Sequence, residues 1–482
     1  MSAPEQVSWL EFILRPAFPV AGATSGEFGR RHSYSRGTAG GLHSTSLNSG
    51  IHEHNNLVGP CDPGKGYTVG IGYFDRIDDC GPVIPVRESG MSVRPEDPSG
   101  AMTMQQIYLD YNATTPIAPS VQEAMLPFLC EHYGNPSSTH SLGRAANAAI
   151  EDARGRVAAI LGADRDEIVF TSGGTEANNL ALQGMLLRDV PTKTGHLVTT
   201  DIEHPAIIEP AKQLERLGIA VTFVKANSQG VVEPEAIEAA LRPDTRLVSV
   251  MHANNETGVI QPIRQISELC HANNVLVHTD AAQTVGKIRT MVGELGVDML
   301  SIAGHKIYAP KGVGALYVNR SVPLEPVIYG AGHERGLRPG TENTPYIVAL
   351  GQASSLVRKA LDESGDRMAM LRDRLLARLR GEIGPRLGLN GQKSERLPNT
   401  LSVNFPSVVG ADLLARIPEL CASTGSACHS GLTRVSPTLA AMGVTPDIAQ
   451  GTVRLSVGWY TSEEQIDRAA ELLIGAWESL AD

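Results

Sequence analysis

The sequence contains no run of about 20 apolar residues, which is the length that a membrane-spanning helix requires. Its six cysteines form no CxxC pair and no closely spaced framework, so they fit a reducing compartment and indicate no metal site. Acidic residues outnumber basic ones, and the formal net charge of −11 argues against nucleic acid or an anionic membrane as a partner. We therefore expect a cytoplasmic protein that binds neither nucleic acid nor membrane.

Periodic patterns are missing from roughly the first hundred residues. Gly, Ser, His, Asn and Pro dominate residues 21–63, a composition typical of disorder. The apolar stretch in residues 7–20 is interrupted by Glu11, Arg15 and prolines, so it indicates neither a signal peptide nor a membrane span. We expect residues 1–103 to form a disordered extension, and a chain that begins at Met104 to keep full activity.

Alternating helix and strand patterns begin at Ile107 and continue to about Pro345. This alternation is typical of a mainly parallel sheet with helices on both faces. The amphipathic residues 344–379 predict one long helix or two, and strand patterns near 400–405 and 453–457 predict a smaller α+β region. We expect a large domain at residues 118–360 and a small C-terminal domain at residues 361–482.

Lys306 and Asp280 each follow a short apolar run that predicts a strand, and we interpret residues 281–296 between them as a helix. In a parallel sheet, this pattern places both side chains at the carboxyl ends of neighbouring strands, where such sheets bind ligands. Pyridoxal phosphate needs this pair, a lysine to bind its aldehyde and an acid beside its pyridine nitrogen. The alternatives are a solvated loop for Lys306 and a helix N-cap for Asp280.

Residues 167–180 predict a third strand, a turn of small residues and the start of a helix. The backbone amides of Gly173, Gly174 and Thr175, with the helix dipole, would form a cradle for an anion. A plain strand-to-helix turn is the alternative. No GxxxxGK or GxGxxG motif is present. His204 ends a further strand, where it either stacks on a flat cofactor or caps the next helix.

Cys428 and Arg454 are the remaining candidates for chemistry. Cys428 lies in the small and polar run of residues 423–431, which predicts an exposed, mobile loop with a reactive thiol. A free cysteine packed as a small apolar side chain is the alternative. Arg454 lies in an apolar strand pattern and needs a partner there, either a substrate carboxylate or an acidic side chain of the protein.

From about Ile107 onward the chain resembles the cysteine desulfurases, a class V aminotransferase-like group of the pyridoxal-phosphate enzymes of fold type I. The resemblance is carried by YLDYNATTP, GNPSS, TSGGTE, EHPA, HANNETG, HTDAAQ, GHKIYAPKGVGALY, GHERGLRPGTEN and TGSACHSG, in that order. It implies an α/β fold with a large, mainly parallel seven-stranded sheet and a small α+β domain that takes in residues 104–117. It also implies a homodimer.

The resemblance assigns roles to the candidate residues. Lys306 would bind the cofactor, Asp280 would pair with its pyridine nitrogen, and His204 would stack on its ring. The remaining contacts would come from Gln283 and Asn255 near the ring hydroxyl, from Gly174, Thr175 and His305 at the phosphate, and from Thr341 across the dimer interface. Arg454, with Asn255, would bind the substrate. Many relatives have serine at the position of Ala303, so one phosphate donor is missing here.

The implied reaction converts L-cysteine to L-alanine. Lys306 or His204 moves protons, and the Cys428 thiolate takes the sulfur as a persulfide for an acceptor such as an iron–sulfur scaffold or a thio-cofactor pathway. A selenocysteine lyase that releases selenide from L-selenocysteine is the first alternative. A non-catalytic sulfur-transfer scaffold is the second, but it predicts the loss of Lys306, Asp280 or Cys428, and all three are present.

Overall fold

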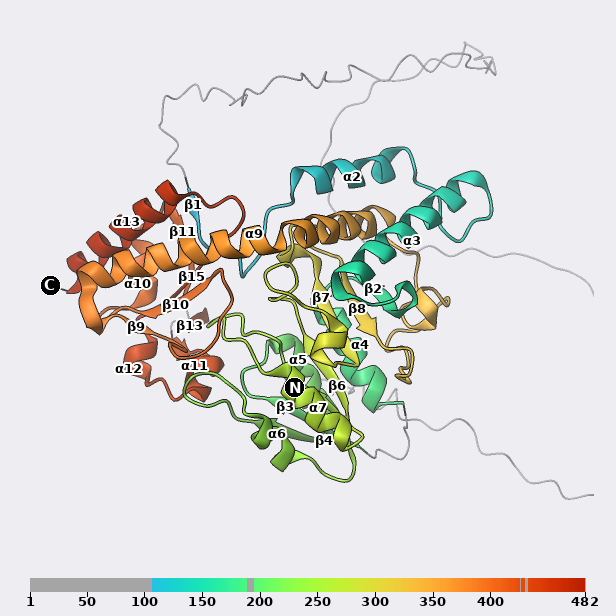
Figure 1. Ribbon diagram of the computed structural model, residues 1–482, viewed down its shortest axis with the longest axis horizontal. Helices are drawn as coiled ribbons and strands as arrows, with labels where there is room; N and C mark the ends of the chain where they lie inside the picture. The colour runs from blue at the N-terminus through green and yellow to red at the C-terminus, as the bar shows by residue number, and fades with distance from the viewer. Residues whose placement is uncertain (1–105, 189–194, 425, 430–431, 482) are drawn as a thin grey trace, which may run out of the picture. The chain divides into compact units, whose positions relative to one another are not determined.

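The computed structural model describes residues 106–188, 195–424, 426–429 and 432–481, so the expectations for residues 1–103 lie outside the described part. Within that part, no helix combines the length and the apolar character needed to cross a membrane. A seven-stranded sheet forms its centre, in the order β2-β8-β7-β6-β5-β3-β4 (Figure 1). The strands are β2 (Ile168–Thr171), β3 (His196–Thr200), β4 (Ala220–Val224), β5 (Thr245–Ser249), β6 (Leu276–Asp280), β7 (Met299–Ala303) and β8 (Gly314–Val318).

Only β8 runs against the other strands of this sheet, because it pairs antiparallel with both β2 and β7. The mainly parallel sheet is therefore confirmed. All five residues of β7 and of β8 are buried, as expected for strands covered on both faces. The parallel pair β6–β7 places the strand ends that precede Asp280 and Lys306 side by side, with Asp280 opposite Ser301.

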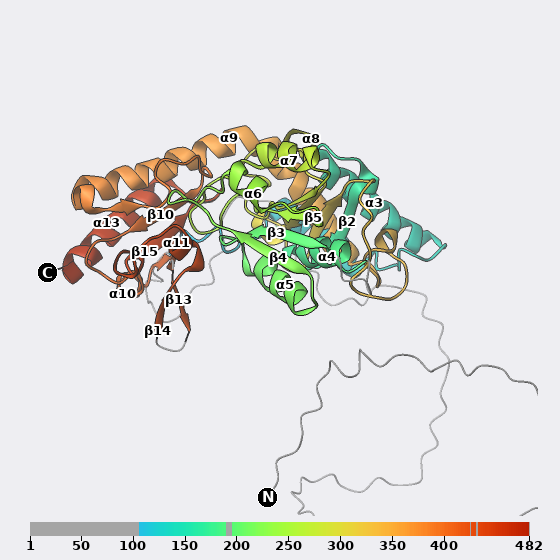
Figure 2. The same ribbon diagram turned by 90° about the horizontal axis from the view of Figure 1, so that it is seen from below.

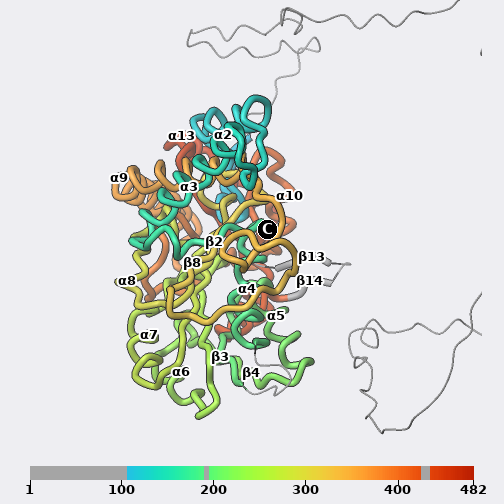
Figure 3. Tube along the Cα trace, turned by 90° about the vertical axis from the view of Figure 1, so that its right-hand side faces the viewer, coloured from blue at the N-terminus to red at the C-terminus, as the bar shows by residue number. Residues whose placement is uncertain are grey.

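Helices cover both faces of the sheet (Figure 2). One apolar core joins the sheet to α4 (Gly174–Leu186) and α5 (Pro205–Arg216). A second core on the opposite face takes in α3 (Ser141–Leu161), α7 (Ile263–Ala272) and the first half of α9 (Thr344–Ile383). Figures 1 and 3 show α2 (Pro119–Cys130) and α3 beside α9. Shorter helices are α6 (Pro234–Ala240), α8 (Val292–Leu295), η1 (Arg165–Glu167), η2 (Gly304–Lys306) and η3 (Glu334–Gly336).

A smaller sheet has the strand order β12-β15-β10-β9 and is antiparallel throughout. Its apolar core includes the second half of α9, which is one continuous helix rather than two, together with Ile107 and Leu109 near the start of the described chain. Its strands are β9 (Gly388–Leu389), β10 (Thr400–Asn404), β12 (Ser423–Thr424) and β15 (Thr452–Ser456), and β1 (Ile107–Tyr108) pairs separately with β11 (Leu420–Cys421). The nearby helices are η4 (Gly384–Arg386), α10 (Gly410–Ala415), α11 (Pro437–Ala441), α12 (Pro446–Ala449) and α13 (Glu463–Ala481).

Two local expectations are wrong. The predicted helix at residues 281–296 is a series of turns followed only by the four-residue α8. Gly286 has φ +78°, and a Cβ there would lie 2.9 Å from Val357 of α9, so close packing selects a turn over a regular helix. The expected loop around Cys428 contains a hairpin, in which β13 (Ser426–His429) pairs with β14 (Leu432–Val435) and Cys428 stands opposite Thr433.

Candidate active site

A cavity of about 430 Å³ lies at the carboxyl ends of the parallel strands of the large sheet. Nine of the residues expected at the site line it, whereas the Thr341 side chain does not. Thr341 is exposed, and its contact across a dimer interface stays a prediction. The side chain of Cys428 lies outside the described residues. The nine lining residues are Gly174, Thr175, His204, Asn255, Asp280, Gln283, His305, Lys306 and Arg454.

Lys306 ends η2, the single turn that follows β7. Its Nζ donates hydrogen bonds to the backbone carbonyl oxygens of Asn112 and Ala113, the latter at 2.8 Å. Burial, with the nearby charge of Arg454, lowers the pKa of Lys306 to about 8. The neutral form of the amine, which is the form that attacks a carbonyl group, is therefore more populated near neutral pH than in a free lysine.

Asp280 ends β6 and is buried. Its Oδ2 accepts a hydrogen bond from Nδ2 of Asn178 in α4 at 2.7 Å, and its Oδ1 accepts one from the backbone amide of Ala282 at 2.9 Å. Asp280 thus caps the turn that follows it and also lines the cavity, so the two interpretations of this residue are compatible. The buried Oδ1 of Asn178 has no hydrogen-bond partner among the described residues.

His204 caps α5, since its Nδ1 accepts a hydrogen bond from the backbone amide of Ala206 at 3.1 Å. Burial lowers the pKa of His204, so the ring is neutral at neutral pH and carries its proton on Nε2. A flat, uncharged ring therefore lines the cavity. Its neighbour Glu203 is also buried, and burial raises the pKa of that carboxyl to about 8.

The first residues of α4, Gly174 and Thr175, form the cavity wall that was expected to hold an anion. Amide groups in the first turn of a helix have no intrahelical acceptor and face outward. A Cβ added at Gly174 would lie 3.3 Å from the Ala303 Cβ, so glycine keeps this wall open. His305 also lines the cavity, and burial, together with nearby Lys306, lowers its pKa to about 4.

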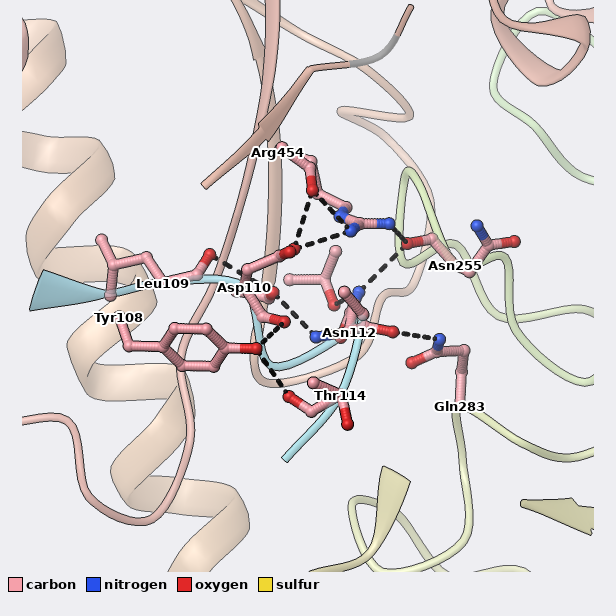
Figure 4. A network of polar contacts seen from close by, with 12 residues as sticks. Tyr108, Leu109, Asp110, Asn112, Thr114, Asn255, Gln283 and Arg454 are labelled. Carbon is pink, nitrogen blue, oxygen red and sulfur yellow. Dashed lines mark hydrogen bonds and ion pairs between the residues drawn. The ribbon is translucent and has the colours of Figure 1, made fainter. Parts of the chain in front are cut away.

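Arg454 reaches the cavity from β15 of the small sheet (Figure 4). Its Nη2 lies 2.7 Å from Oδ1 of Asp110 and 3.1 Å from Oγ of Ser423, and its Nη1 donates to the Asn255 carbonyl oxygen at 3.1 Å. Its buried Nε has no partner within the described residues. The ion pair with Asp110 confirms the structural interpretation of Arg454, while its place in the cavity leaves the substrate role open.

Asn112 is a site residue that the sequence did not single out, although it lies within YLDYNATTP. Its side chain donates to Thr400 Oγ1 at 2.8 Å and to the Asn255 carbonyl at 3.2 Å, and it accepts from Asn399 Nδ2 at 3.0 Å. Its own carbonyl oxygen accepts from both Lys306 and Gln283. Asn112 therefore connects the large sheet's cavity to β10 of the small sheet.

These residues fit pyridoxal phosphate by the chemistry of their functional groups. The cavity combines a lysine amine with a lowered pKa, a buried carboxylate, a neutral flat ring and the N-terminus of α4. The unpartnered amide oxygen of Asn178 beside Asp280 adds a polar atom that a bound group can satisfy. The volume lies in the range of small-molecule sites. Among the described residues, no group of His, Cys, Asp and Glu could hold a metal ion.

Comparison with known proteins agrees with this geometry. The family described as aminotransferase class V matches residues 107–469. A cysteine desulfurase IscS of Dictyoglomus turgidum is 43% identical over 77% of this chain and 94% of its own length, and a cysteine desulfurase of Mus musculus is 40% identical over 83% and 85%.

Solved structures give the same result. A NifS-like protein superposes with a TM-score of 0.72 at 39% identity, covering 78% of this chain and all of that one. A structure described as SspA in complex with cysteine superposes with a TM-score of 0.66 at 35% identity, covering 74% of this chain and 99% of that one. The chain therefore belongs to the class V aminotransferase family, and within it to the cysteine desulfurases.

Proposed function

We propose that this protein uses pyridoxal phosphate to convert L-cysteine to L-alanine and transfers the sulfur atom to Cys428. The observation that carries the proposal is that Lys306, with its lowered pKa, shares one cavity with the buried carboxylate Asp280 and with Arg454. When bound, the cofactor supplies an electron sink for the substrate carbon atoms. Lys306, Asp280, His204 and the start of α4 would hold it.

Arg454 is the proposed binding group for the substrate carboxylate. Two of its guanidinium nitrogens contact Asp110, Ser423 and the Asn255 carbonyl, and its buried Nε has no hydrogen-bond partner among the described residues. These contacts fix the plane of the guanidinium before the substrate arrives, which reduces the entropy lost on binding. Asp110 also competes for the same positive charge, so it limits how tightly a carboxylate is held.

Lys306 is the proposed group for proton transfer at the substrate carbons. Its amine loses and regains a proton near neutral pH, because burial has lowered its pKa to about 8. His204 is less suited to this work, since its Nδ1 is occupied by the Ala206 amide and its Nε2 already carries a proton. We assign His204 to packing against the cofactor ring.

Sulfur transfer follows from attack by the Cys428 thiolate on the substrate sulfur. The bond between Cys428 Sγ and that sulfur forms as the substrate carbon–sulfur bond breaks, and the electron pair of the broken bond stays on carbon, which gains a proton. The products are L-alanine and a persulfide on Cys428, and no external oxidant is needed. Access to the thiolate governs the rates of attack and of later delivery to an acceptor protein.

The proposed working form is a homodimer in the cytoplasm that delivers sulfur to an acceptor such as an iron–sulfur scaffold. Large exposed apolar side chains on α2, just after it and ahead of η3 support a subunit contact. They are Leu126, Leu129, Tyr133, Ile328 and Tyr329, with exposed fractions from 47% to 86%. Thr341 lies in the segment that follows η3.

The test is to load the purified protein with pyridoxal phosphate, add L-cysteine and a reductant, and measure alanine and sulfide together. We expect equal amounts of both products, and their loss in Cys428→Ala. The matched control is Cys130→Ala, because Cys130 is an exposed cysteine on α2 that should not affect either product. Absence of alanine in the unaltered protein would refute the proposal. Selenide from L-selenocysteine that persists in Cys428→Ala, without sulfide from L-cysteine, would favour the lyase.

A further inference from the structure

Lys287 is a buried lysine that lies outside the cavity lining, in the turns that follow β6. Its side chain is 7% exposed, and no carboxylate of the described residues lies within ion-pair distance. Its Nζ donates to two oxygen atoms of one residue, the Gln283 carbonyl at 3.1 Å and the Gln283 Oε1 at 2.9 Å. Burial of an ammonium without a counter-charge is unfavourable, so this position calls for an explanation.

The contact determines which way the Gln283 side-chain amide faces. Lys287 Nζ donates to the amide oxygen, so the amide nitrogen of Gln283 lies on the other side. That nitrogen donates to the Asn112 carbonyl oxygen at 3.0 Å, and Figure 4 shows the amide turned toward Asn112. The same carbonyl oxygen accepts the hydrogen bond from Lys306.

These bonds connect Lys287 to the cavity through Gln283 and the carbonyl oxygen of Asn112. Lys287 fixes Gln283, and Gln283 shares an acceptor with the amine of Lys306. Gln283 lines the cavity while Lys287 does not, so Lys287 has no direct route to a bound molecule. Among the described residues, these bonds connect the Lys287 amine to the site only through Gln283 and the Asn112 carbonyl.

We propose that Lys287 is a positioning residue, which holds the Gln283 amide with its amino group directed toward Lys306 and the cavity. An amino group at this wall suits an acceptor oxygen of the bound molecule, such as the ring oxygen of pyridoxal phosphate. The inference rests on the proposed use of that cofactor. It extends the proposal by assigning a function to a residue that touches neither cofactor nor substrate.

The test compares Lys287→Met, Gln283→Leu and the double variant, each loaded with pyridoxal phosphate. Methionine keeps the length of the side chain and removes the charge. In Lys287→Met, the yellow absorbance of the bound cofactor should titrate at higher pH, because a Gln283 amide that is no longer held in place stops donating to the ring oxygen, and that donor opposes an added proton. Cofactor release should be about fivefold faster, as expected for the loss of one hydrogen bond. Gln283→Leu should show the same changes, and the double variant should add little to either.

The matched control is Lys225→Met, since Lys225 is exposed and directly follows the edge strand β4 of the large sheet, and its absorbance titration should be unchanged. An unchanged titration in Lys287→Met, or fully additive effects in the double variant, would overturn the inference. A protein that binds no pyridoxal phosphate at all would instead overturn the proposed function.

Discussion

The side-chain amine of Lys306 lies 2.8 Å from the carbonyl oxygen of Ala113, a residue 193 positions earlier in the chain. Lys306 follows β7 of the large sheet, whereas Ala113 follows β1, whose residue Ile107 packs in the core of the small sheet. The reactive amine, which follows a strand of the large sheet, is thus held by backbone that leads from the small sheet. Its environment depends on how closely these two parts pack, and this dependence underlies the first two predictions.

The rate at which the apoprotein takes up pyridoxal phosphate should rise with pH through about 8, where Lys306 loses its proton. Arg454 is one of the groups that lowers this pKa, so Arg454→Met should move the midpoint of the rate profile to higher pH. Stopped-flow measurement of the yellow absorbance over a pH series would test this. Arg358→Met, at an exposed position on α9, is the control, and a shift of equal size there would contradict the prediction.

Asn112→Ala should lower the free energy of unfolding by about 1–3 kcal/mol, because it leaves buried donors and acceptors without partners. The groups affected are the Asn399 side chain and the Thr400 hydroxyl. Urea unfolding of the apoprotein would measure the loss. An unfolding free energy within error of the unaltered protein would show that Asn112 is not a structural connection.

Asp280→Asn should reduce alanine formation by about 100-fold or more, because a neutral amide does not stabilise positive charge on a bound ring as a carboxylate does. Asparagine has nearly the same size as aspartate, and its amide oxygen still accepts a hydrogen bond. Steady-state kinetics with L-cysteine would measure the effect. Asp244→Asn is the control, since Asp244 is 44% exposed in an ion pair with Arg242, and it should retain full activity.

Arg154→Met should destabilise the protein by about 3–5 kcal/mol, because it leaves the carboxylate of Glu334 buried without its partner. Two guanidinium nitrogens of Arg154 lie 2.8 and 2.7 Å from the Glu334 oxygens, and the Glu334 side chain is only 2% exposed. Arg320→Met is the control, since its ion pairs are exposed and should contribute at most about 1 kcal/mol. Equal losses in chemical denaturation would contradict this contrast.

Stability should rise as the pH rises from about 7 toward 10, through the effect of Lys287. Burial lowers the pKa of Lys287 from 10.5 to about 7, so over this interval the unfolded chain carries a proton on Lys287 that the folded chain has lost. Raising the pH therefore favours the folded form. Unfolding measured over a pH series should show a weaker rise in Lys287→Met. The same slope in both proteins would contradict the pKa shift.

Strand ends were the part of the site that local sequence patterns could predict. The apolar runs before Asp280 and Lys306 mark β6 and β7, and the parallel pairing of those strands confirms that the two residues share one edge of the sheet. The start of α4 was found in the same way, from the small residues after β2. In each case a burial pattern and a turn signal lie within about ten residues of each other.

The segment between β6 and β7 shows where local patterns were insufficient. Residues 281–296 have the composition of a helix, yet α9 packs so closely at Gly286 that a turn forms there. That turn buries Lys287 against Gln283. The packing partner Val357 comes from a distant part of the chain, so no window around residue 286 contains the information.

The sequence by itself determined the alternation of strands and helices, the strand ends that present Asp280 and Lys306, and the family to which the chain belongs. These features depend on short-range patterns of burial and on motifs that are continuous along the chain. Only the tertiary structure decided that Asn112 connects the two sheets, that Asp110 pairs with Arg454, and that Lys287 orients Gln283. The first two contacts join groups that lie hundreds of positions apart in the chain, and the third depends on packing against α9. The energy of a polar contact depends on distance in space and on burial, and short-range sequence patterns contain neither.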